Sequence, residues 1–208
     1  MLNLLRKDFI ALKSSLWTIL LYLAVFSFAF IPKSEMSIYF VGIYTAFGSI
    51  ILATMIDIKN HNHKFLVTLP ISRKHIVLAK YITAVIYTLF GVIASYGIHQ
   101  LINLSFPQLE KPDYTVWSIL VSVGMLLVLI SIYMPLFYAL SKKGAGIINA
   151  VFMVSLIILA QPAAVLMNMV SEKGFINDQT LLLILIGIVV VFIASYFLTI
   201  SLFTRKDL

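Results

Sequence analysis

The chain has 208 residues, of which 62% are hydrophobic and 11% are charged. Soluble domains average about 45–50% apolar and about 25% charged residues, so this composition excludes an ordinary soluble protein and predicts an integral membrane protein. The chain carries a net charge of +7 and contains no cysteine, which excludes disulfides and thiolate chemistry. At about 20 apolar residues per spanning helix, residues 1–208 are expected to form one transmembrane domain with no room for a catalytic module.

Residues 1–15 are predicted to form an amphipathic helix. Large apolar side chains recur there at steps of three and four, which places them on one helical face. This face comprises Leu2, Leu5, Phe9, Leu12 and Leu16, and the charged residues Arg6, Lys7, Asp8 and Lys13 lie largely elsewhere. The pattern predicts an interfacial helix that lies on the membrane. A cleaved signal peptide is the alternative, because a basic start, an apolar run and Ser27-Phe28-Ala29 fit that pattern loosely.

Six apolar runs predict an all-α fold with six transmembrane helices. They cover about 16–31, 38–56, 76–104, 116–140, 145–170 and 180–203. A helix over the third run would be about 43 Å long against about 30 Å of hydrocarbon. We therefore expect the third helix to tilt or to project from the membrane, with Lys80 reaching the interface by snorkelling.

The distribution of positive charge predicts the orientation. If the N-terminus is cytoplasmic, twelve of the fifteen Lys and Arg residues lie inside and each outer loop holds only one. The positive-inside rule therefore predicts a multi-pass protein of the plasma membrane with both termini in the cytoplasm. This distribution also explains the basic net charge without a nucleic-acid partner.

The longest polar interruption covers residues 57–75, between the second and third predicted spans. It mixes apolar with basic side chains, which suits binding of a partner protein: Phe65, Leu66 and Leu69 with Lys59, Lys64, Arg73 and Lys74. Pro70 ends any helix that precedes it, and Ser72 is the predicted N-cap of the third span. Arg73 and Lys74 would then occupy a first turn whose macrodipole disfavours each cation by about 0.3–1 kcal/mol. Membrane topology and an acidic groove on a partner are two explanations for this cost.

The segment from Phe65 to Lys80 resembles the corresponding part of small ABC-2 type transporter permeases, most specifically in its Leu-Pro-Ile-Ser-Arg core. Phenol-soluble-modulin exporters and lantibiotic or bacitracin immunity permeases are similar proteins. The resemblance implies a non-enzymatic permease that pairs with a second identical or homologous permease and with a separate ABC ATPase, which holds ATP and Mg²⁺. It also implies that residues 57–75 contain a coupling helix. The implied ATPase contacts are Asp57, Lys64, Phe65, Leu66, Leu69 and Arg73.

Residues that would carry chemistry are sparse. No Asp, Glu, Lys or Arg lies in the middle of a predicted span, which counts against an ion-coupled carrier, although His99 within the third span could titrate. His61 and His63 lie near Asp57 but lack a third strong ligand at fixed spacing. Known catalytic and phosphate-binding motifs are absent from the sequence. We therefore expect no active site, metal or cofactor in this chain.

Two features indicate either helix packing or a substrate path. Gly91, Ser95, His99 and Asn103 recur every four residues on the third span. Small residues in membrane helices favour close packing, whereas the polar members of this set also suit a substrate-facing surface. For His99 there is a further interpretation, that of an interfacial side chain near the outer surface. In the fifth span, Gln161-Pro162 is expected to break the helix and to face the protein interior.

The predicted function is that of a permease subunit in an ATP-driven exporter of amphipathic peptides or antimicrobials. A membrane sensor or immunity subunit, which binds an amphiphile without moving it, is the alternative from another class. A structural assembly subunit is a third.

Overall fold

The computed structural model of the protein describes residues 2–13, 16–31, 37–60, 71–107, 116–140, 144–156, 158 and 178–205. Its principal helices are α1 (Leu2–Lys13), α2 (Leu16–Phe30), α3 (Ser37–Lys59), α5 (Arg73–Ser105), α6 (Val116–Ala139) and α8 (Asp178–Thr204). A shorter apolar helix covers Gly144–Leu156. Because these described ranges contain helices and no strand, the all-α prediction is confirmed.

Four helices in the described ranges are long and apolar enough to cross a membrane, namely α3, α5, α6 and α8. The described parts of α2 and of the Gly144–Leu156 helix are shorter. At 1.5 Å per residue they reach only about 20–23 Å, less than the roughly 30 Å of a hydrocarbon core. Residues 159–170 of the fifth predicted span lie outside the described residues. The described residues therefore contain four candidate spans, and the count of six stays a prediction.

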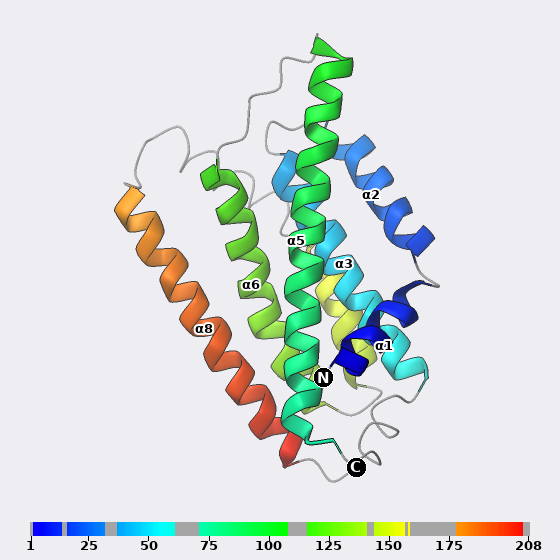
Figure 1. Cartoon of the computed structure of the whole chain (residues 1–208), viewed down its shortest axis with the longest axis vertical. Helices are drawn as coiled ribbons and strands as arrows, with labels where there is room; N and C mark the ends of the chain where they lie inside the picture. Colours follow the sequence, from blue (N-terminus) through cyan, green and yellow to red (C-terminus); the bar gives the residue numbers. More distant parts are fainter. Residues whose placement is uncertain are drawn as a thin grey trace.

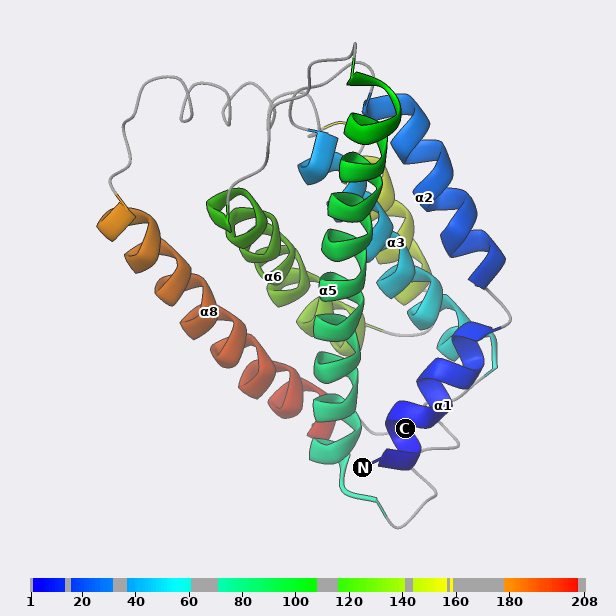
Figure 2. The ribbon, with the colours of Figure 1, turned by 45° about the horizontal axis from the view of Figure 1, so that its top comes forward.

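Helix α5 runs through the middle of the bundle, with α6 and α8 on one side and α2 and α3 on the other (Figures 1 and 2). α1 lies against the last turns of α3 and the first turns of α5. The start of α5 and the end of α8 meet at this same end of the molecule. We call the region where α1, α3, α5 and α8 converge the charged end.

Ser72 sets the start of α5. Its backbone is extended, with φ −65° and ψ 140°, and its side-chain oxygen accepts a hydrogen bond from the backbone N–H of His75. That bond satisfies one of the donors that a helix start leaves without an intrahelical partner. The predicted N-cap is therefore confirmed. The helix that follows has 33 residues and is about 50 Å long, even longer than predicted.

Small side chains bring α3 and α5 into close contact. A Cβ atom added to Gly91 of α5 would lie 2.7 Å from the Ala46 Cβ, 2.8 Å from the Ala46 backbone N and 2.9 Å from the Gly42 carbonyl oxygen of α3. A Cβ at Gly42 would meet the Ser95 Cβ at 3.6 Å. The small-xxx-small spacing on both helices thus allows backbone approach, as is common where lipid supplies no hydrophobic drive.

Hydroxyl groups tie the other helices together. The Tyr81 hydroxyl of α5 lies 2.8 Å from both the Ser195 Oγ and the Thr199 Oγ1 of α8. Ser195 in turn donates to the carbonyl oxygen of Ser131 in α6 at 2.7 Å. A second set joins α3, α6 and the Gly144–Leu156 helix, because the Tyr133 hydroxyl lies 2.5 Å from Thr54 Oγ1 and donates to Asn149 Oδ1 at 2.6 Å. These polar contacts cross the bundle where unsatisfied groups would be costly.

The contact at Gly91 predicts opposite effects for two glycine substitutions in one helix. Gly91→Ala would force its Cβ into α3 and should cost about 1–3 kcal/mol of stability. Gly97→Ala meets no heavy atom within 4 Å and should gain up to about 1 kcal/mol from helix propensity. Thermal unfolding in detergent checks both. Equal melting temperatures for the two variants would contradict close packing at Gly91.

Candidate functional site at the charged end

Four charged side chains meet at the charged end. The Lys80 ammonium of α5 lies 2.9 Å from the Asp8 Oδ1 of α1 and also pairs with the Asp57 Oδ2 of α3. The Lys7 ammonium lies 3.1 Å from the same Asp8 oxygen and 3.2 Å from the Asp57 Oδ1. We call Lys7, Asp8, Asp57 and Lys80 the ion cluster. Among the described residues it joins two cations to two carboxylates and is charge-balanced.

The ion cluster is largely removed from solvent. The side chains of Asp57, Asp8 and Lys80 are 2%, 3% and 6% exposed, whereas Lys7 at 28% covers the solvent side. Thr83 donates a further hydrogen bond to the Asp8 Oδ2 at 3.2 Å. Taking isolated charges out of water costs several kcal/mol each, so each member depends on its partners. The cluster therefore determines how α1, α3 and α5 sit together.

A small cavity lies next to the cluster. Its lining combines polar groups of α3 and α5 with apolar side chains, namely Ile50, Ala53, Thr54, Lys80, Thr83, Ala84, Tyr87 and Met134. It has room for about one water molecule. The cavity is therefore too small for an organic substrate, and the arrangement serves to hold helices together.

Arg73 makes a separate junction between α5 and α8. Its Nη1 donates to the carbonyl oxygens of Phe203 at 3.1 Å and Thr204 at 3.0 Å, in the last turn of α8. Its guanidinium also lies 5.8 Å from the centroid of the Phe203 ring. The last carbonyls of a helix attract cations, so α8 compensates for the unfavourable position of Arg73 in the first turn of α5. The C-terminal end of α8 thus explains the positive charge of Arg73 at the start of α5. The sequence alone had suggested membrane topology or an acidic groove on a partner instead.

Comparison with families of known proteins identifies the chain's relatives. The sequence pattern of one family, described as ABC-2 family transporter protein, matches residues 3–204. The chain belongs to this family. Comparison with curated proteins and with solved structures finds no match. The predicted resemblance to ABC-2 permeases is confirmed, and the chain is a membrane transport component that is not itself catalytic.

The predicted ATPase contacts of this ABC-2 protein fall into two groups. Lys64, Phe65, Leu66 and Leu69 lie outside the described residues. Asp57 and Arg73 are described, and both face other helices of the same chain: Asp57 is buried in the ion cluster and Arg73 caps α8. Lys59 and Lys74, beside them in the sequence, are exposed.

The predicted stripe on α5 faces the protein interior. Gly91 and Ser95 are buried and pack against α3, as the packing interpretation expects. His99 is fully buried within the chain, with its Nε2 3.3 Å from the Asn103 Nδ2, so its side chain faces other protein groups. The reason is the position of the stripe, which continues from Gly91 along the α3-facing side of α5. Gln161 and Pro162 lie outside the described residues.

Sequence reasoning missed the ion cluster. Asp8 was expected on the polar face of an interfacial helix, and Lys80 was expected to snorkel; both are instead buried against each other. The sequence does contain a signal, since Asp8, Asp57 and Lys80 are isolated charges at the edges of apolar runs and have opposite signs. Charges of this kind in membrane proteins usually pair. The signal does not say which charges form the pairs.

The ion cluster predicts that Lys80 is far more important for folding than a surface lysine of the same helix. Lys80→Met leaves two buried carboxylates facing Lys7 alone and should lower the free energy of unfolding by about 3–5 kcal/mol. Lys74→Met, at an exposed position, should change it by less than about 0.5 kcal/mol. Thermal unfolding in detergent compares them.

A double variant tests whether charge balance is the cause. Adding Asp8→Leu to Lys80→Met leaves Lys7 and Asp57 as a balanced pair, so the double variant should be more stable than Lys80→Met alone. Additive losses from the two substitutions would show that the cluster does not act as a charge-balanced unit.

Proposed function

We propose that the chain is the membrane-spanning permease subunit of an ATP-driven exporter. It works with a second permease copy, identical or homologous, and with separate ABC ATPase subunits. The observation that carries the proposal is the anchoring of residues 57–75 at both ends. Asp57 ties the first end to α1 and α5, and Arg73 ties the second to α8. A partner that presses on this segment would therefore act on four helices at once.

The ATPase contact lies in the middle of that segment. Phe65, Leu66 and Leu69 insert into the partner as apolar anchors, and Lys64 meets acidic groups at its rim. Asp57 and Arg73 serve as internal anchors instead, because both are engaged with other helices of this chain. The engagement of Asp57 and Arg73 with other helices supports the role of this segment as a coupling element.

The charged end faces the cytoplasm, with both termini on that side of the plasma membrane. Support comes from the distribution of cations, since the loops at the opposite end contribute one each. ATP and Mg²⁺ would be held by the ATPase on the same side. This orientation places the coupling segment where a cytoplasmic motor reaches it.

Helix α5 transmits the motion. It begins at the coupling segment and runs about 50 Å through the bundle, in contact with α3, α6 and α8. A tilt of α5 against α3 would change access to the interior between inward and outward states. The substrate is an amphipathic peptide or antimicrobial, which suits the apolar character of the spans.

The coupling role predicts unequal effects of two substitutions within residues 57–75. Phe65→Ala removes a buried interface anchor, which costs 2 kcal/mol or more at a binding hot spot. Lys59→Ala removes an exposed charge and should matter less. Co-purification of the ATPase with each variant measures the difference. Equal recovery with both variants would argue against docking through Phe65.

Transport itself is tested in proteoliposomes that contain the permease and its ATPase. We expect ATP-driven movement of a labelled amphipathic peptide by the wild type. Ser95→Leu, at the α3–α5 contact, should abolish substrate-stimulated hydrolysis and export together, because overpacking by about 1–3 kcal/mol shifts a balanced two-state equilibrium roughly tenfold. Gly97→Leu, in open space on the same helix, is the matched control.

One outcome would replace the exporter by a sensor or immunity subunit. That outcome is binding of the peptide by the wild type with no ATP-dependent flux across a broad peptide panel.

A further inference from the structure

The ion cluster fixes the rotation of α1 about its own axis. Asp8 is held by Lys80 at 2.9 Å and by Thr83 at 3.2 Å, so its side of the helix faces the bundle. Leu4, one turn earlier on the same side, is also buried at 6% exposure. Residues four apart share a helical face, so these two contacts define the inward side of α1 and thereby its outward side.

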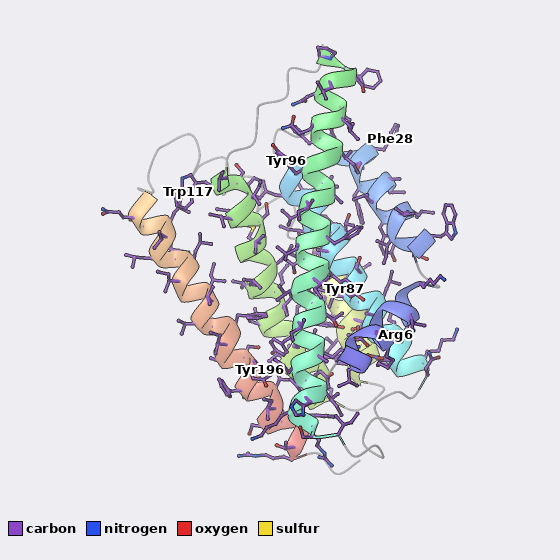
Figure 3. The ribbon with its side chains drawn as sticks, in the orientation of Figure 1. Arg6, Phe28, Tyr87, Tyr96, Trp117 and Tyr196 are labelled. Atoms are coloured by element: carbon purple, nitrogen blue, oxygen red, sulfur yellow. The ribbon has the colours of Figure 1, made fainter. Side chains whose placement is uncertain are left out.

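Among the side chains that the structure describes, the outward side of α1 carries two cations and one large apolar residue. Arg6, Ile10 and Lys13 follow at steps of four and three, and all three are exposed, with Ile10 at 60%. Figure 3 shows Arg6 on α1 in the lower half of the view, whereas Phe28 and Trp117 lie in the upper half. Asp8 is the single acid of α1 and points inward. The outward side therefore has two cations and no acid among its described residues.

The helix that follows α1 has an exposed apolar face. Trp17, in the first turn of α2, is 82% exposed, and exposed large hydrophobic residues continue along that helix at Leu20, Leu21, Val25 and Phe28. Along the chain, the exposed residues are thus cations with an isoleucine, then a tryptophan, then the apolar face of α2. This order matches the depth profile of a bilayer, from phosphate groups through the interfacial zone favoured by tryptophan to acyl chains.

We propose that the outward face of α1, formed by Arg6, Ile10 and Lys13, binds the headgroups of anionic phospholipids. Arg6 and Lys13 pair with phosphate oxygens, and Ile10 enters the boundary between headgroups and acyl chains. Charge complementarity selects anionic over zwitterionic lipid, because only a lipid with net negative charge retains an uncompensated charge for the two cations. This interaction is independent of the proposed transport function and does not require the ATPase.

The test uses the full-length permease in lipid nanodiscs. Discs of phosphatidylcholine are compared with discs of phosphatidylcholine and phosphatidylglycerol at a molar ratio of 7:3. A lipid that binds the folded state raises its melting temperature, so the wild type should melt higher in the anionic discs. This gain should shrink at high salt, because exposed ion pairs are screened.

Two variants assign the effect to α1. The double variant Arg6→Gln with Lys13→Gln should lose at least half of the gain while it melts like the wild type in phosphatidylcholine. The charge-preserving variant Arg6→Lys with Lys13→Arg should keep the gain. An equal gain in the wild type and in the double glutamine variant would overturn the proposal. So would a wild type that gains nothing from phosphatidylglycerol, and the basic face would then be assigned to an acidic protein partner.

Discussion

Asp8 and Asp57 share the ammonium group of Lys80 where little water reaches them, and this shared ion pair is the constraint on which the charged end depends. Each of the three comes from a different helix. A buried carboxylate without a cation beside it would lose more solvation free energy than its remaining contacts provide. Helices α1, α3 and α5 are therefore held where these three charges pair, and Lys7 on the solvent side brings the cluster to charge balance.

A second charge, that of the partly buried Arg73, is stabilised in a similar way by the C-terminal end of α8. The positive end of the α5 macrodipole disfavours Arg73, but the last carbonyls of α8 are within hydrogen-bond distance and favour it. Arg73 is thus unfavourable within α5 but forms a specific contact between α5 and α8, which are far apart in sequence. Together with the ion cluster, this contact holds Asp57 and Arg73, near the two ends of the proposed coupling segment, against other helices.

Packing in the rest of the bundle follows the rules of a membrane interior. Gly42 and Ala46 of α3 meet Gly91 of α5 at backbone distance, so van der Waals contact replaces the hydrophobic drive that water would supply. The hydroxyl groups of Tyr81 and Tyr133 form hydrogen bonds with side chains of neighbouring helices. These bonds satisfy polar groups that could not form hydrogen bonds with lipid chains. These contacts position α5 between α3 and α8, and the basic outward side of α1 remains available to lipid.

The sequence alone determined the properties that depend on neighbouring residues. Composition established a helical membrane protein, Pro70 and Ser72 located the start of α5, and the segment around them indicated the ABC-2 family. Only the tertiary structure decided which charges pair. Asp8 and Lys80 are 72 positions apart, and hydropathy and capping report local preference without saying which distant helices touch. Asp57 and Arg73 were expected to face a partner for this reason. In the folded chain Asp57 is buried beside Lys80 and Arg73 caps the last turn of α8, because a charge at the edge of a membrane interior is most stable beside an opposite charge or dipole.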